Sequence, residues 1–372
     1  MAKNAFFLAV VALLSFFSAT FAQLDLVPSD KQALPIFFFH GVTSNSQAGR
    51  NLLANLTAEG RLFTSLSFCS DACSIQALNL HIPLATKQIR SIVANDSRYD
   101  NGYVFITHSQ GGAIGRGVVE EMDNHNVKVL VSLAGAVNGG FNGPQLEDAL
   151  PFRVFVTDLG PRLLPVTIFD FSKYTPADYF GKLQRDFAEL AVNTPSLQDQ
   201  YSAFNLGRSP YYDQWVKTNP YFPVIINLKV CDAGDVKCED DKKRRRDNFL
   251  KLKEAHFFAS PADEFIAPWQ RSHLAYYNEV SSAEEIETKF LSFKVLNVTQ
   301  TREYTNDTYG LRTLDKRDGL FFHTAQGVGH SCWLRDYIPT GQNSTCYFQP
   351  VFNQHVYPVL QGSAFFHTRA SC

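Results

Sequence analysis

The chain has 372 residues, with 34 Lys and Arg against 36 Asp and Glu. Hydrophobic residues make up 45% of the sequence and charged residues 19%, a composition that indicates an ordered globular protein and excludes a mostly disordered one. A formal net charge of −2 without an extended basic face argues against nucleic acid as a partner. The length allows two domains, but a single α/β core with insertions uses as many residues.

The N-terminal segment has the pattern of a secretory signal peptide. Lys3 precedes an apolar run over residues 5–17, and small residues around Ala22 suit cleavage there. The run is shorter than the roughly 20 residues that span a bilayer, and no later stretch replaces it. We therefore expect a signal peptide over residues 1–22 and a lumenal or extracellular mature chain over 23–372, without a transmembrane segment. An uncleaved N-terminal anchor is the alternative.

Sequons and cysteines agree with export. Sequons for N-glycosylation, which are used only in the secretory route, stand at Asn55, Asn95, Asn297, Asn306 and Asn343. The seven cysteines suggest three local pairs, although spacing does not fix connectivity: Cys69 with Cys73, Cys231 with Cys238, and Cys332 with Cys346. Cys372 is left over and keeps a disulfide-linked dimer open. No cysteine or histidine spacing predicts a metal site.

Short continuous apolar runs indicate buried strands of a parallel sheet. They lie at residues 35–40, 102–107, 127–133, 255–260 and 320–324. Helical spacing over 47–66, 82–95 and 113–122 alternates with the first three runs. This order predicts an α/β fold with a mostly parallel central sheet and helices on both faces.

The alternation stops between residues 141 and 228, where aromatic residues and prolines become frequent. We interpret this stretch as an inserted lid of short helices and loops over the carboxyl edge of the sheet, within one domain. The basic run Lys242-Lys-Arg-Arg-Arg246 follows. We expect it to be a solvated helix start, with a processing site or a contact with an anionic surface as the alternative.

Ser109 lies in Thr107-His-Ser-Gln-Gly-Gly112, between a predicted buried strand and a predicted helix. A serine in such a tight turn exposes its hydroxyl at the top of the sheet, as in the nucleophile elbow of α/β-hydrolases, usually G-x-S-x-G. Thr107 replaces the first glycine and weakens the motif. We predict Ser109 as a nucleophile, with a helix-capping role as the alternative.

Acyl transfer also needs donors for the oxyanion and a base with its acid. The N–H groups of Val42, after the first strand, and of Gln110, after the serine, are the expected oxyanion donors. The base and acid must follow in the order Ser, Asp or Glu, His. His330 comes after the last strand and Asp263 after the strand 255–260, with Glu264 as a rival acid.

These segments resemble the palmitoyl-protein thioesterase family. The resemblance covers most of the mature chain and runs through PIFFFHGV, THSQGG, SLAGAVNG, DEFIAPWQRSHLAYY, YGLRTLDKRDGL and GVGHSCWL. It implies a monomeric, lysosomal or secreted α/β-hydrolase that cleaves long-chain acyl thioesters through Ser109, Asp263 and His330. S-acylated proteins, palmitate on cysteine above all, or acyl-CoA would be the substrates. Thr107 stands where family members usually have glycine.

The chemistry fits this expectation without a metal or cofactor, because a thioester carbonyl is electrophilic and a thiolate leaves easily. The Phe- and Tyr-rich insertion would form a groove for a long acyl chain, whose burial contributes about 0.8 kcal/mol per CH₂. Two alternatives stay open. One is a secreted lipase or carboxylesterase acting on oxyesters, because specificity depends on the groove. The other is a non-catalytic lipid-binding relative, to which only Thr107 points.

Overall fold

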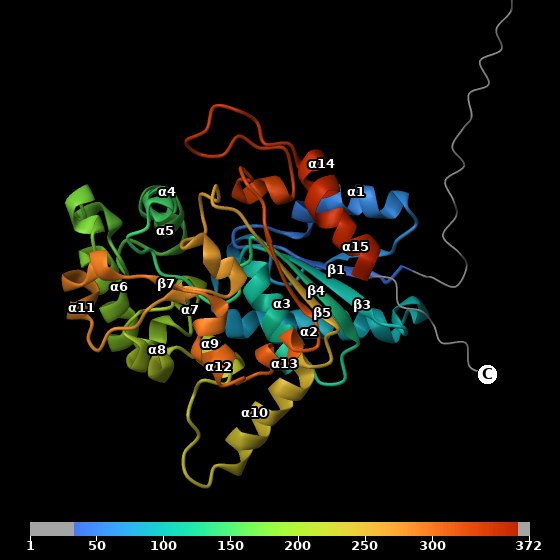
Figure 1. Ribbon diagram of the computed structural model, residues 1–372, viewed down its shortest axis with the longest axis horizontal. Coiled ribbons are helices and arrows are strands. Elements are labelled where there is room, and N and C mark those ends of the chain that lie inside the picture. Colours follow the sequence, from blue (N-terminus) through green and yellow to red (C-terminus); the bar gives the residue numbers. More distant parts are fainter. Residues whose placement is uncertain (1–32, 364–372) are drawn as a thin grey trace, which may run out of the picture.

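The computed structural model describes residues 33–363. The expected signal peptide over 1–22 and Cys372 lie outside this range. Six strands form one parallel sheet in the order β2-β1-β3-β4-β5-β8 (Figure 1). The strands are β1 (Ile36–Phe39), β2 (Phe63–Ser65), β3 (Tyr103–His108), β4 (Val127–Leu133), β5 (Glu254–Ala259) and β8 (Leu320–Thr324). The predicted parallel α/β sheet is confirmed.

Helices cover both faces of the sheet, which explains why the central strands are mostly apolar on both faces. On one face, alternate strand residues such as Phe37 and Phe105 pack with α2 (Leu78–Ala94), α3 (Gln110–Glu121) and α10 (Val236–Phe249). On the other, Phe38 and Ile106 pack with α1 (Arg50–Ala58), α14 (Phe348–Val351) and α15 (Tyr357–Ser363). Figure 1 shows these two layers on opposite sides of the strands.

The prediction of one helix over 47–66 is wrong about where the helix ends. The segment divides into a short 3-10 turn, Ser46–Gly49, and α1, which ends at Ala58. Gly60 then takes a left-handed φ of 83°, a conformation that commonly ends helices. The chain turns and pairs as β2 with β1, so that Phe63 stands opposite Ile36.

Residues 141–228 fold as short helices joined by loops beside the carboxyl edge of the sheet (Figure 1). They are α4 (Ala149–Val154), α5 (Gly160–Leu163), α6 (Lys182–Asn193), α7 (Ser202–Asn205), α8 (Tyr212–Thr218) and α9 (Phe222–Ile225). Several have a hydrophobic cluster of their own, which includes Phe152, Leu183 and Phe204. This cluster packs separately from the two cores of the sheet.

A second set of short elements follows β5 and was not predicted. β6 (Tyr276–Tyr277) and β7 (Val295–Leu296) form a two-stranded antiparallel ribbon. The helices α11 (Glu284–Thr288), α12 (Arg302–Thr305) and α13 (Leu311–Asp315) complete this stretch before β8.

Three disulfides join the cysteines in the expected local pairs. Their Cα–Cα distances are 4.8 Å for Cys69–Cys73, 5.7 Å for Cys231–Cys238 and 5.9 Å for Cys332–Cys346. Over residues 33–363, no helix has the length and apolar character needed to cross a membrane. The same range contains no group of three side chains able to hold a metal ion.

Candidate active site

Ser109 occupies the turn between β3 and α3. Its φ of 57° and ψ of −128° lie where few non-glycine residues are found, and such strain clusters at functional sites. Glycines allow the tight packing around it, because a Cβ at Gly111 would lie 2.5 Å from the Phe39 carbonyl oxygen and one at Gly41 would lie 2.9 Å from Ser109 Cβ. The Ser109 side chain makes no capping hydrogen bond to α3, so the capping interpretation loses its support.

Thr107 is fully buried. Its hydroxyl donates to the Val131 carbonyl at 3.4 Å. Its methyl group faces Gly115 on α3, where an added Cβ would lie only 2.5 Å from Thr107 Cγ2. A glycine on the helix therefore makes the room that a glycine at position 107 would otherwise provide.

Asp263 and His330 lie together as predicted from sequence. The Nδ1 of His330 is 2.9 Å from Asp263 Oδ2, while Asp263 Oδ1 accepts the N–H groups of Phe265 and Ile266 at 2.9 Å each. Burial lowers the pKa of His330, but the charge of Asp263 and its hydrogen bond outweigh burial and raise that pKa above its ordinary value. With Nδ1 held by Asp263, Nε2 is the ring atom left for Ser109, which lines the same cavity.

Glu264, the rival acid, contacts the backbone of the histidine and not its ring. Its carboxylate accepts the His330 N–H at 3.0 Å and the hydroxyl of Tyr337. From the other side, His108 Nε2 lies 2.9 Å from the His330 carbonyl oxygen. The loop that carries the imidazole is thus held at both its N–H and its carbonyl group.

The two expected oxyanion donors belong to residues that line the cavity with Ser109. Gln110 is the first residue of α3, and N–H groups in the first turn of a helix have no partner within it. The positive end of the helix dipole adds to their attraction for an anion. Val42 follows β1 and also packs against the hydrophobic cluster of the inserted helices.

Ser74 connects the surroundings of both donors and was not predicted from sequence. Its Oγ accepts the N–H of Thr43 at 2.7 Å, and its carbonyl accepts Gln110 Nε2 at 2.7 Å. The Cys69–Cys73 disulfide closes the loop directly before it. No motif marks Ser74, because its two partners are 31 and 36 residues away in the chain.

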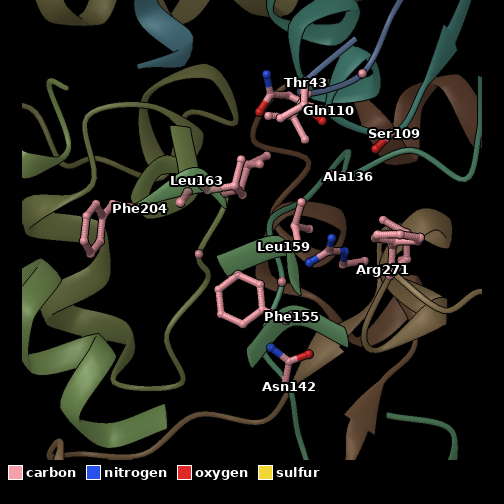
Figure 2. Close-up of a pocket in the computed structure, with 18 of the residues that line it drawn as sticks. Thr43, Ser109, Gln110, Ala136, Asn142, Phe155, Leu159, Leu163, Phe204 and Arg271 are labelled. Atoms are coloured by element: carbon pink, nitrogen blue, oxygen red, sulfur yellow. The ribbon is translucent and has the colours of Figure 1, made fainter. Parts of the chain in front are cut away.

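The cavity beside Ser109 has a volume of about 600 Å³, within the usual range for small-molecule sites. Figure 2 shows Leu159, Leu163, Phe155 and Phe204 of the inserted segment around it, with Ser109 at its edge. Its apolar lining suits a hydrocarbon chain that begins at the serine.

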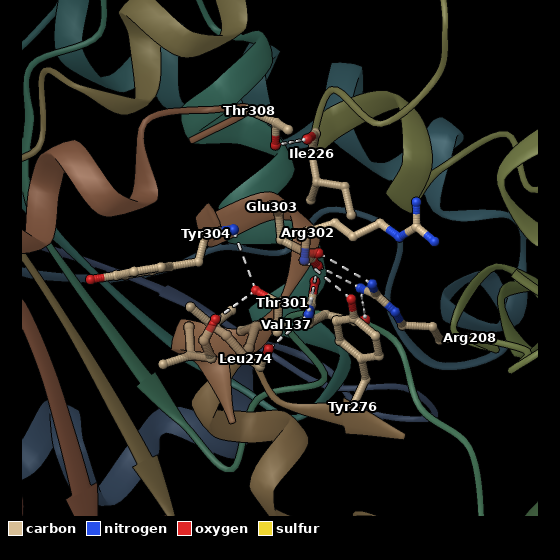
Figure 3. A network of polar contacts seen from close by, with 12 residues as sticks. Val137, Arg208, Ile226, Leu274, Tyr276, Thr301, Arg302, Glu303, Tyr304 and Thr308 are labelled. Atoms are coloured by element: carbon tan, nitrogen blue, oxygen red, sulfur yellow. Dashed lines mark hydrogen bonds and ion pairs between the residues drawn. The ribbon is translucent and has the colours of Figure 1, made fainter. Parts of the chain in front are cut away.

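A buried ion pair fixes one wall of this cavity. Arg208, which lines it, donates from Nη1 to Glu303 Oε1 at 2.7 Å, and its guanidinium carbon lies 3.5 Å from the ring centroid of Tyr276. Figure 3 shows Arg208 beside Tyr276 and Glu303. Asn138 also donates to Glu303 Oε1, at 3.1 Å. The network ties the inserted segment to the loop after β4 and to α12.

The sequence model of the palmitoyl protein thioesterase family matches residues 35–330, which is most of the chain. The chain belongs to this family. It is a hydrolase of the thioesterase type with an α/β-hydrolase fold. The expected resemblance is confirmed.

Relatives of similar length share about a quarter of their residues with it. Lysosomal thioesterase PPT2-B from Xenopus laevis is 24% identical over 314 residues, covering 83% of this chain and 91% of the relative. Human lysosomal thioesterase PPT2 is 24% identical over 80% of this chain and 82% of its own. Palmitoyl-protein thioesterase 3 from Dictyostelium discoideum is 22% identical over 88% of this chain and 92% of the relative.

Solved structures with a similar fold include esterases and lipases. A Pyrobaculum calidifontis esterase has a TM-score of 0.40 and 15% identity, over 91% of this chain and 77% of the esterase. A Paleococcus ferrophilus monoacylglycerol lipase has a TM-score of 0.38 and 13% identity, over 89% of this chain and 97% of the lipase.

Proposed function

We propose that this protein hydrolyses long-chain acyl thioesters, palmitoyl groups on cysteine above all, as a serine hydrolase. The observation that carries the proposal is the shared cavity: Ser109 at its strained turn and His330, whose ring Asp263 holds, line one space that the inserted segment walls with apolar side chains. S-acylated proteins or acyl-CoA are the proposed substrates, and no cofactor enters the reaction.

In the proposed reaction, His330 Nε2 takes the proton of Ser109 while Oγ attacks the thioester carbonyl carbon. The N–H groups of Val42 and Gln110 stabilise the negative oxygen of the tetrahedral intermediate. The carbon–sulfur bond breaks, the thiolate takes the proton from His330, and the acyl group remains on Ser109. His330 then deprotonates a water that attacks the acyl-enzyme, and it gives that proton to Ser109 Oγ as the bond between Oγ and the acyl carbon breaks, which releases the fatty acid and restores the serine. Asp263 stabilises the imidazolium in both halves.

The inserted segment 141–228 is proposed as the lid and acyl groove of a single domain over 23–372. Burying a C16 chain among its side chains contributes about 0.8 kcal/mol per CH₂ that leaves water. The relatives bear names that describe thioesterases, and the name of the Dictyostelium relative adds palmitoyl proteins. These names and the apolar lining support a long acyl chain.

We further propose a monomer that follows the secretory route to the lysosome or is secreted. The names of the relatives and the three disulfides support this compartment. Among the sequon asparagines, Asn55 is half-buried and the others are exposed: Asn95, Asn297, Asn306 and Asn343. Loss of mass on treatment with an endoglycosidase tests their glycosylation.

The test of substrate class is hydrolysis of palmitoyl-CoA and of a palmitoylated cysteine peptide beside a palmitate oxyester. The wild type and Ser109→Ala are compared at equal concentration. The proposal expects preference for the thioesters and at least about 10³-fold loss in the variant. Turnover of the oxyester alone would make the protein a lipase-like esterase. Binding of palmitate without turnover of any substrate would make it the non-catalytic relative.

A further inference from the structure

The cavity beside Ser109 contains a cation that lacks a counter-ion. Arg271 lies in the 3-10 turn Trp269–His273 after β5 and lines the cavity. Its Nη1 donates to the Ala267 carbonyl at 3.3 Å, while its Nε is buried and has no hydrogen-bond partner among the described residues. Figure 2 shows its guanidinium pointing into the cavity between Ala136 and Phe155.

Arg271 is half-buried as a whole, and the three arginines of the described residues that are fully buried are each neutralised by a carboxylate. The pairs are Arg61–Glu59 at 2.8 Å, Arg116–Glu120 at 2.8 Å and Arg208–Glu303 at 2.7 Å. Over residues 33–363, Arg271 has no carboxylate oxygen within 4.0 Å. Because a charge that is partly withdrawn from water without a counter-ion destabilises a fold, the buried, unpartnered Nε of Arg271 in the cavity wall points to a ligand.

The backbone around Arg271 is shaped to admit its charged end. A Cβ at Gly140 would lie 1.6 Å from Arg271 Nη1, so only glycine leaves room for the guanidinium there. Burial lowers the pKa of Arg271 to about 10, while Asp263 and Asp148 act from a greater distance to raise it. The group therefore stays charged at acidic and neutral pH.

We propose that Arg271 binds a carboxylate inside the acyl cavity, an inference that rests on the proposed function of the same site. A guanidinium presents paired N–H donors whose spacing matches the two oxygens of a carboxylate. The carboxylate has two possible sources. It is either the group that hydrolysis creates on the fatty acid product, or one carried by the acyl chain of the substrate itself.

Two arms of one experiment distinguish these sources in Arg271→Met. The first measures inhibition by free palmitate; the second compares a plain acyl thioester with one of equal chain length that ends in a carboxylate. If Arg271 binds the product, the inhibition constant of palmitate should be at least about tenfold higher in the variant than in the wild type. Binding of the chain predicts a loss of similar size in preference for the carboxylate-bearing thioester.

The matched control is Arg153→Met, because Arg153 is exposed on α4 and does not line the cavity. Arg153→Met should change neither the inhibition by palmitate nor the preference for the carboxylate-bearing thioester. If Arg271→Met also leaves both the palmitate inhibition and the substrate preference unchanged, the inference is wrong. If the wild type cleaves neither thioester, the proposed function fails while the binding of palmitate still tests Arg271.

Thermal unfolding separates binding from a structural role. Replacing a half-buried charge that has no counter-ion with methionine should leave the melting temperature unchanged or raise it. Added palmitate should raise the melting temperature of the wild type more than that of Arg271→Met. A lower melting temperature in the variant with an equal palmitate shift would mean that Arg271 only supports the fold.

Discussion

Thr107 and Gly115 face each other across β3 and α3, and each sets the size that the other position allows. The added methyl of a Gly115→Ala variant would meet Thr107 Cγ2 at 2.5 Å in a fully buried site. Such overpacking typically costs about 1–3 kcal/mol. The room that a glycine at position 107 would provide is therefore supplied by Gly115 on α3.

A double-mutant cycle tests this pairing. Gly115→Ala should lower the free energy of unfolding in the wild type, whereas in a Thr107→Gly background the same change should be tolerated, since alanine favours a helix over glycine. Chemical denaturation of the four proteins measures the coupling. Equal effects of Gly115→Ala in both backgrounds would show that the two residues are independent.

Ser74 is expected to act as a positioning residue for the oxyanion donors. Removing its hydroxyl frees the N–H of Thr43, next to Val42, so Ser74→Ala should lower kcat about tenfold to a hundredfold with little change in KM. Ser70→Ala, which removes a hydroxyl that bonds only to Ser67 in the same loop, is the matched control. A rise in KM with unchanged kcat would assign Ser74 to substrate binding instead.

At the scale of elements, Asp148 anchors the start of the inserted segment to β6. It is buried just before α4 and accepts the Tyr277 hydroxyl at 2.6 Å and the Gly143 N–H at 2.9 Å. Burial raises the pKa of Asp148 from 3.8 to about 7. The folded state thus favours the protonated acid, and the stability from this group is full below pH 3.8 and is lost as the pH rises through about 7.

Asp148→Asn keeps an acceptor for both hydrogen bonds but cannot ionise. Because the wild type loses the stability from this group between pH 3.8 and about 7, we expect the variant to exceed the wild type in thermal stability by more at pH 8 than at pH 5. Melting temperatures at the two pH values measure the difference. The same pH dependence in both proteins would exclude Asp148 as the titrating group.

The basic run at 242–246 forms ion pairs with residues that are distant in the sequence. It was expected to start a solvated helix, but it lies inside α10, and its arginines form ion pairs with other elements. Arg244 and Arg245 reach Glu121 at the end of α3 at 2.6 and 2.5 Å, and Arg246 reaches Asp307 at 2.5 Å. Nothing in the run itself indicates these partners.

At the scale of the whole molecule, the sheet and the places of Ser109, Asp263 and His330 were predictable from sequence. Continuous apolar runs mark strands buried on both faces, and the three residues each follow such a run. β2 was missed because three residues after a helix carry too little pattern. Ser74, Asp148 and Arg271 were missed because their importance depends on contacts between distant segments.

The central claim is that Ser109 carries the acyl group during hydrolysis. The most direct measurement is mass spectrometry of the protein quenched shortly after mixing with palmitoyl-CoA, with the adduct located by peptide mapping. We expect a palmitoyl ester on the peptide that contains Ser109 and a burst of free thiol of equal amount, and we expect neither in Ser109→Ala. Thioester turnover that persists in Ser109→Ala, with no acyl group on Ser109 in the wild type, would contradict it.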